Sequence, residues 1–214
     1  KAFDRMEREK IQNLIIDIRG NEGGTTDVAT YFYKKLAWKD ARTVGRKGHL
    51  RYKKVSPEVR PHVGTWSRWF YNVGIWTKRV NKHYRTPRFK RNKGKKYKKS
   101  KDAYTGKVYL LADASNSSAT YFLAEYLSEN KLATLVGTET GGTKMGITGG
   151  QMFFLNLPNS KIEIDIPLIG YYPVKVMPEE GILPDVLVAL TADDFIKGID
   201  PQLEKAKSLI QAQQ

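Results

Sequence analysis

The strongest constraint on the fold is a repeated pattern in which an apolar strand ends in small residues and a helix follows at once. The first copy runs from NLIIDIR (13–19) through the turn GNEGG (20–24) into a helix over 25–37. The second runs from KVYLLAD (107–113) through a serine cluster into a helix over 119–130. Short apolar runs of this kind are typical of strands buried in a parallel sheet. The pattern therefore predicts an α/β fold with a largely parallel central sheet.

Shorter patterns assign the remaining elements. The helical spacing of apolar residues predicts a helix over 2–12, and a third buried strand is expected over 133–137. Three more strands, a turn and a final helix complete the assignment, at 151–157, 161–167, 172–177, 178–185 and 201–211. The chain of 214 residues, 40% of them hydrophobic, is long enough for one sizeable core with a lobe attached to it.

The excess positive charge is confined to one segment. Of the 37 Lys and Arg, 15 fall within 59–101, which has no acidic residue, and elsewhere 22 basic residues balance 22 acidic ones. The charge is densest in RTPRFKRNKGKKYKKSK (85–101), and such a run repels itself and is usually a solvated, mobile loop. We therefore interpret 40–105 as a basic, aromatic insertion within a core domain formed by 1–39 and 106–214.

Two features of the insertion allow alternative interpretations. Aromatic and apolar residues recur at three- and four-residue steps, at Trp66, Trp69, Phe70, Val73 and Trp76. Helical spacing favours packing of this stripe onto the body over the lining of a substrate groove or lid. The basic run can attract nucleic acid, acidic lipid headgroups or acidic peptides. It matches no nucleic-acid recognition fold, so we do not expect nucleic acid as a partner.

Several classes of protein are excluded by composition. The chain has no cysteine, which rules out disulfides and cysteine-ligated metals, and we expect neither a metal nor a cofactor. No apolar run of 18 or more residues is present, so nothing in the sequence is expected to span a membrane. The chain opens on KAFDRMEREK, which is helix-like and lacks an initiator Met and a signal peptide. We interpret it as the C-terminal part of a longer protein.

Ser118 is the candidate nucleophile, because it lies where the second strand gives way to a helix. Free backbone N–H groups and the positive end of the helix dipole lie at such a position. The N–H of Ala119 can then help to hold an oxyanion, and the turn that contains Gly23 and Gly24 can supply a second donor. Judged from local pattern alone, helix capping by Ser117 or Ser118 is favoured, and GNEGG is a tight turn.

Four motifs, taken in order, resemble those of one family. LIIDIRGNEGG resembles the "apolar strand, Asp-Leu-Arg-x-Asn-x-Gly-Gly" signature of the carboxyl-terminal processing, or tail-specific, serine peptidases, a group that includes the core of tricorn protease. Ser118-Ala119 resembles the nucleophile Ser-Ala of that family. LVGTETGG (135–142) resembles its "Gly-Glu-x-Thr-x-Gly" segment, and GILPD (181–185) resembles its "Gly-Ile-x-Pro-Asp". Together the motifs cover about 13–24 and 107–187.

This resemblance implies a fold, an activity and a set of roles. The fold would be a crotonase-like or ClpP-like α/β superhelix, and Ser118 would be the nucleophile. The oxyanion hole would pair the N–H of Ala119 with that of Gly23 or Gly24. Asp17 and Arg19 would be structural and would support the glycine turn. The resemblance also implies protein or peptide substrates and an exported bacterial protein in the periplasm or cell envelope. The oligomeric state stays open.

The general base differs between branches of this family. Bacterial tail-specific members use a lysine in "Thr-x-Gly-Lys", a position that falls on Thr143, with Lys144 one residue later. The tricorn-like branch uses an upstream histidine assisted by a glutamate near the final motif, where Glu179 and Glu180 lie. We favour the second arrangement, with Glu180 as the assisting residue and Lys144 as the alternative base. The histidines of the chain, at 49, 62 and 83, all lie in the insertion, and we expect each to be exposed and incidental.

The leading function is a serine endopeptidase that forms an acyl-enzyme on unstructured or C-terminal protein segments. The first alternative is a non-catalytic module of the same fold that binds an apolar ligand or a peptide, as in the retinoid-binding relatives of the family. The second alternative is a polyanion binder that uses the basic insertion. Replacement of Ser118 separates the first two, and a steep salt dependence marks the third.

Overall fold

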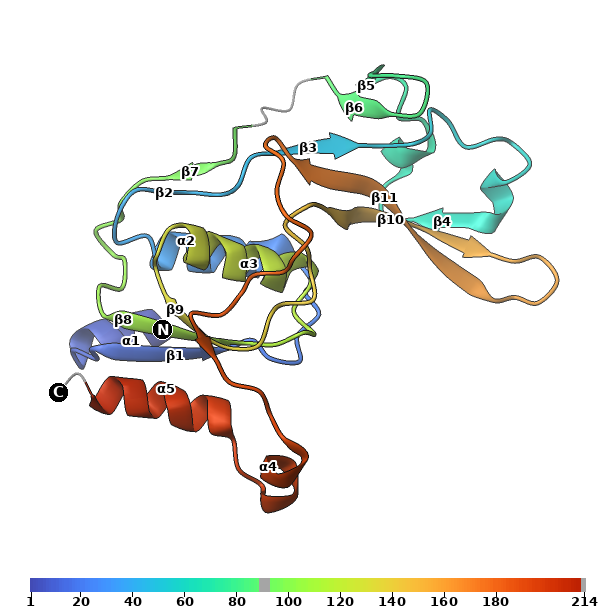
Figure 1. Ribbon diagram of the computed structural model, residues 1–214. Coiled ribbons are helices and arrows are strands. Elements are labelled where there is room, and N and C mark those ends of the chain that lie inside the picture. The colour runs from blue at the N-terminus through green and yellow to red at the C-terminus, as the bar shows by residue number, and fades with distance from the viewer. Residues whose placement is uncertain (89–92, 213–214) are drawn as a thin grey trace. The chain divides into compact units, whose positions relative to one another are not determined.

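The computed structural model describes residues 1–88 and 93–212, and Figure 1 shows their course. The chain divides into two compact units. The first unit contains Lys1–Val44, Lys95–Lys144 and Pro178–Gln214, and the second contains Gly45–Gly94 and Met145–Met177. Within the described residues, no helix combines the length and the apolar character needed to cross a bilayer.

The first unit is built on a parallel four-stranded sheet in the order β1-β8-β9-β12. These strands are β1 (Asn13–Asp17), β8 (Lys107–Ala112), β9 (Thr134–Gly137) and β12 (Val186–Leu187). Helices α2 (Thr26–Lys35) and α3 (Ser118–Glu129) lie over one face of the sheet, and α5 (Pro201–Gln211) covers the other (Figure 1). The predicted α/β class with a parallel central sheet is confirmed, whereas the crotonase-like superhelix stays a prediction.

The apolar face of α5 explains why this helix closes the sheet. Ala206 is fully buried and belongs to a cluster with Tyr109, Leu111 and Val136 of the central strands. On the other face, α3 buries a continuous row of side chains because its apolar residues recur at helical spacing. That row includes Tyr121, Leu123, Ala124, Tyr126 and Leu127.

The ends of the predicted insertion belong to the first unit. β2 (Ala41–Arg42) pairs with β7 (Lys96–Tyr97), and the ring of Tyr97 is buried at 5.3 Å from that of Tyr33 and 5.7 Å from that of Tyr126. The prediction of a solvated loop is therefore wrong for this stretch, because alternate side chains of a strand point inward. Residues 89–92 of the same basic run lie outside the described residues.

The second unit is an antiparallel sheet in the order β3-β11-β10-β4. Its strands are β3 (Arg46–His49), β4 (Val63–Thr65), β10 (Ile147–Asn156) and β11 (Glu163–Pro173), with a hairpin of β5 (Thr77–Arg79) and β6 (Arg85–Pro87). Its core contains Leu50, Val63, Val73, Phe153, Leu168 and Ile169. The insertion therefore does not form this unit alone. Pairing of β3 with β11 and of β4 with β10 joins 145–177 to it, although the sequence placed that segment in the core domain.

Several other elements differ from those expected from the sequence. The strands expected over 151–157 and 161–167 belong to one long hairpin, β10–β11, and the strand expected over 172–177 is wrong beyond Pro173, where β11 ends. The aromatic stripe forms no α-helix: only the short 3-10 helices η1 (Arg60–His62) and η2 (Arg68–Tyr71) occur nearby, and Trp66 and Trp69 are exposed whereas Val73 is buried. At the termini, α1 (Ala2–Arg8) ends earlier than expected, and α4 (Ala192–Lys197) was not predicted although Thr191 and Asp194 form a capping box before it.

Candidate active site

Two loops meet at the carboxyl ends of β1 and β8. The glycine turn (20–24) follows β1, and the serine loop (113–117) follows β8, because parallel neighbours end at the same edge of a sheet. The backbone N–H of Gly20 donates to Oδ2 of Asp113 at 3.0 Å. Two further hydrogen bonds join the region, from Oγ of Ser117 to O of Glu22 at 2.7 Å and from Oγ1 of Thr120 to O of Asn21 at 2.8 Å. The two loops therefore hold each other in place.

Asn116 is the centre of this network. Its side chain is fully buried, and Nδ2 donates to the carbonyl oxygens of Ile18 and, at 3.1 Å, of Asn21. Its Oδ1 accepts the backbone N–H of Asp113 at 2.8 Å. No role was predicted for this residue from the sequence. The only signal was a single amide side chain among small hydroxyl residues, which by itself is ordinary turn chemistry.

Ser118 is the first residue of α3 and adopts a left-handed backbone conformation with φ +48°. Such a φ is uncommon for a residue with a Cβ and is found at strained functional positions, including the nucleophile turn between a strand and a helix. Capping does not account for the serines, because the N-cap residue is Ser117 and its hydroxyl makes no capping bond. Within the described residues, the hydroxyl of Ser118 has no hydrogen-bond partner.

Gly23 lies directly against this serine. A Cβ atom on Gly23 would come within 2.7 Å of the Cβ of Ser118 and within 2.9 Å of the backbone N of Ala119, and the φ of Gly23 is +115°. Only glycine fits both the space and the conformation. The structure therefore places Ser118, Ala119 and the glycine turn side by side, and their roles as nucleophile and oxyanion donors stay predictions.

The backbone donors near Ser118 are not equivalent. The N–H of Gly23 already donates to Oδ1 of Asn21 at 2.9 Å. In the described part of the chain, the N–H of Gly24 has no acceptor, and neither has that of Ala119, which is one of the unpaired donors in the first turn of a helix. Gly24 and Ala119 are therefore the two candidate oxyanion donors that remain available.

A hollow of about 470 Å³ lies beside these donors within the first unit. It is lined by Gly23, Gly24 and Ala119 and by apolar side chains that include Ile16, Val28, Phe32 and Leu123. The surface of this hollow is therefore mainly apolar.

Lys144 and Glu180 contact each other. Nζ of Lys144 lies 2.9 Å from Oε1 of Glu180, and the backbone N–H of Lys144 donates to O of Glu180 at 2.7 Å. The segment before Lys144 touches the serine loop, since the N–H of Gly142 donates to O of Asn116 at 3.2 Å. No hydrogen bond or ion pair links Lys144 or Glu180 to Ser118 among the described residues. Nζ of Lys144 is thus bound by Glu180 and not by the hydroxyl of Ser118.

Arg19 joins the strand end before the glycine turn to the start of α5. Its guanidinium bonds to the carboxylate of Asp17 at 2.6 Å and donates to both carboxylate oxygens of Asp200 at 2.7 Å. The hydrogen bonds from Arg19 lower the pKa of Asp200 to about 2, and they also lower the pKa of Asp17. Both pairs are partly exposed. This arrangement fits the structural role expected for Asp17 and Arg19.

All three histidines belong to the second unit. His62 and His83 are exposed, as expected. His49 is half-buried instead, with its ring 5.5 Å from the rings of Tyr84 and Tyr172, and this burial lowers its pKa. The expectation of an exposed side chain is therefore wrong for His49, because β3 pairs with β11 and brings it beside Tyr172.

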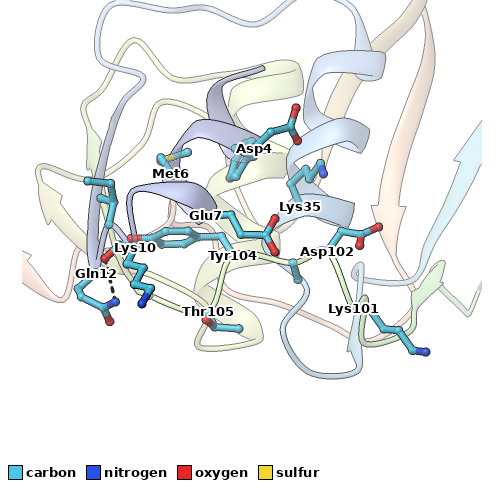
Figure 2. Close-up of a pocket in the computed structure, with 14 residues that line it drawn as sticks. Asp4, Met6, Glu7, Lys10, Gln12, Lys35, Lys101, Asp102, Tyr104 and Thr105 are labelled. Carbon is cyan, nitrogen blue, oxygen red and sulfur yellow. Dashed lines mark hydrogen bonds between the residues drawn. The ribbon is translucent and has the colours of Figure 1, made fainter.

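A second hollow in the first unit lies away from these loops. Figure 2 shows its lining, which includes Asp4, Glu7, Lys35, Asp102 and Tyr104. The lining also contains the residues just before β1 and β8, so this hollow lies at the amino ends of the strands. Its charges are mixed in sign, and the described residues contain no group of His, Asp and Glu able to hold a metal ion. The loops at the carboxyl ends are the stronger candidate site.

A parallel α/β sheet that presents a serine hydroxyl beside free backbone N–H groups defines a fold and site of the serine hydrolase class. The profile of peptidase family S41 matches residues 1–188. The chain therefore belongs to peptidase family S41, a family of serine peptidases, and the membership predicted from the four motifs is confirmed. A search of curated proteins gave no significant match.

Two solved structures with TM-scores above 0.5 show the same fold, and a third is reported beside them. A candidate peptidase from Parabacteroides merdae is 21% identical with a TM-score of 0.59, over 96% of this chain and 55% of that one. Mature CPAF is 17% identical with a TM-score of 0.54, over 97% and 45%. The photosystem II D1 C-terminal processing protease is 17% identical with a TM-score of 0.47, over 88% and 37%. The chain thus spans about half the length of the first of these structures and less of the other two.

Proposed function

We propose that this chain is the catalytic part of a serine endopeptidase that cleaves unstructured or C-terminal segments of proteins. The observation that carries the proposal is the placement of Ser118, with its left-handed backbone, against Gly23 and beside the N–H groups of Ala119 and Gly24. Family membership supports the same chemistry.

In this mechanism the Oγ of Ser118 attacks the carbonyl carbon of the scissile peptide bond, and a general base takes the hydroxyl proton. The N–H groups of Ala119 and Gly24 stabilise the oxyanion that forms. The C–N bond then breaks, and the base returns the proton to the leaving amine. Water hydrolyses the ester on Ser118 by the same steps and regenerates the hydroxyl.

The substrate residue that donates the scissile carbonyl is proposed to be apolar. The hollow beside the candidate oxyanion donors is lined mainly by apolar side chains, among them Ile16, Val28, Phe32 and Leu123, which would remove a hydrocarbon side chain from water. The one charged residue among the described residues of its lining, Asp17, is already bound by Arg19.

The base is proposed to be a histidine outside this chain, assisted by Glu180. Two observations support this choice over Lys144. The hydroxyl of Ser118 has no partner in the described residues, and the ammonium of Lys144 is held by Glu180. An extracytoplasmic location, in the periplasm or cell envelope, is likewise a proposal that follows from the family resemblance.

The test is cleavage of an unfolded protein by the full-length protein and by Ser118→Ala. Ser115→Ala is the matched control, because Ser115 is an exposed serine of the same loop. We expect wild type and Ser115→Ala to produce fragments and Ser118→Ala to produce none. If none of the folded proteins cleaves, and each still binds an apolar ligand or a peptide, the chain is the non-catalytic module instead.

A further inference from the structure

The charge of the chain belongs almost entirely to the second unit. The residues of that unit include 17 Lys and Arg but only 3 Asp and Glu, whereas the first unit has 20 and 19. The excess positive charge thus belongs to the second unit, whereas the basic residues of the first unit are balanced by acidic ones. A field of this size attracts anionic surfaces over roughly one Debye length, about 8 Å at physiological salt.

Part of this unit combines cations with exposed apolar side chains. Lys54, Arg60, Arg68, Trp69 and Ile75 line one shallow hollow of about 340 Å³, and we call these five residues the Trp69 surface. Trp69 is 72% exposed and Ile75 is 69% exposed. The guanidinium of Arg60 lies 4.9 Å from the centre of the Tyr71 ring, which holds it at the surface. None of the three cations has an acidic partner within residues 1–88 and 93–212.

We infer that the Trp69 surface docks the second unit onto the surface of an anionic lipid bilayer. Lipid phosphates match the three unpaired cations, and Trp prefers the boundary between headgroups and acyl chains. An aliphatic side chain such as Ile75 gains free energy only when hydrocarbon or protein removes it from water. Together the five side chains supply both of the forces that hold a peripheral protein on a membrane.

A single-stranded nucleic acid is the main competing occupant. It would explain the cations, and a base can stack on Trp69. It would leave Ile75 in water, because bases and phosphates offer an aliphatic side chain little to bury against. The exposed Ile75 therefore favours lipid. The inference does not rest on the peptidase proposal, since no residue of the Trp69 surface belongs to the candidate active site.

The experiment is co-sedimentation of the full-length protein with vesicles of phosphatidylglycerol and phosphatidylcholine in equal parts, compared with vesicles of phosphatidylcholine alone. We expect binding to the anionic vesicles only, weakening as salt is raised. Arg60→Gln and Arg68→Gln should each weaken binding about fivefold, since one cation near an anionic surface contributes about 1 kcal/mol. Trp69→Ala should weaken binding, and Trp69→Phe should retain most of it.

Matched controls come from the first unit. Arg8→Gln removes an exposed cation, and Phe195→Ala removes an aromatic ring that is as exposed as Trp69. Neither control should change vesicle binding, and all variants should keep the cleavage activity on a soluble substrate. The inference is wrong if wild type ignores anionic vesicles, or if the Trp69 and Arg variants bind as wild type does. It is also wrong if single-stranded RNA, and not vesicles, is bound through the same residues.

Discussion

Gly23 and Ser118 are packed so closely that a Cβ on Gly23 would lie 2.7 Å from the Cβ of Ser118. We therefore expect Gly23→Ala to displace the serine and the neighbouring N–H of Ala119. A displacement of about 1 Å at a reacting group can cost about 100-fold in rate. The measurement is the rate at which a fluorophosphonate probe labels Ser118.

Gly20→Ala is the control for that substitution. Gly20 also has a positive φ, +69°, but a Cβ there meets no atom within 4 Å. This variant should lose about 1 kcal/mol of stability through backbone strain and keep most of its labelling rate. Equal loss of labelling in both variants would show that strain in the turn, and not contact with Ser118, controls the site.

Asn116→Ala should loosen the junction of the two loops. The change leaves the carbonyl of Ile18, a buried residue, without its amide donor, and it removes one of the two donors to the carbonyl of Asn21. It should cost about 1–3 kcal/mol of unfolding free energy. Asn116→Asp should behave similarly, because the carboxylate keeps the acceptor and loses both donors. Urea denaturation measures the loss, with Ser115→Ala as a control. A wild-type stability in both Asn116 variants would contradict this role.

Lys144→Gln distinguishes the two proposed bases. If an upstream histidine is the base, the cleavage rate of the variant should stay within about tenfold of the wild-type rate. The rate should also fall at acidic pH around the ordinary histidine pKa of about 6.5. Glu180→Gln should reduce activity more than Lys144→Gln. A near-complete loss of activity in a folded Lys144→Gln protein would instead identify Lys144 as the base.

Asp200→Asn should lower stability in a pH-dependent way. The bonds from Arg19 lower the pKa of Asp200 from 3.8 to about 2 in the folded protein. A carboxylate with a lower pKa in the folded state stabilises the fold above pH 3.8, and this contribution disappears as the pH falls to about 2. Because the side chain is 38% exposed, we expect a loss of roughly 1 kcal/mol at neutral pH.

The Asp200 prediction is checked by thermal unfolding at pH 7 and near pH 2. Asparagine is also a good N-cap, so the substitution leaves the start of α5 intact and isolates the ion pair. Asp193→Asn is the control, because its pair with Lys197 is exposed on α4 and should contribute little. A stability difference that persisted in acid would show that the charge is not its source.

The parallel sheet and the serine loop were predictable because their information is local. Each βα unit is contiguous, and an apolar strand followed by glycines or serines and a helix allows few other folds. The end of α3 and the bounds of α5 also follow from helical spacing. The close contact of Gly23 with Ser118 required the family resemblance, because residues so far apart in sequence meet only when β1 pairs with β8.

The second unit was not predictable for the opposite reason. Its sheet forms by pairing of β3 with β11 and of β4 with β10, and these partners are separated by long stretches of chain. The spacing of the aromatic stripe was typical of a helix that does not form, because apolar residues three and four positions apart also occur in irregular chain. In this irregular chain Val73 is buried and Trp69 is exposed. The role of Asn116 was not predicted, because it depends on the burial of the side-chain amide. Burial cannot be read from a local sequence pattern.

The bond between Arg19 and Asp200 spans 181 positions of the chain. The ribosome therefore synthesises the glycine turn and the serine loop well before Asp200, the residue whose carboxylate accepts hydrogen bonds from Arg19. A nascent chain that already contains Ser118 still lacks this support until α5 has emerged. The order of synthesis thus leaves the glycine turn without its ion pair to Asp200 until the start of α5 has been made.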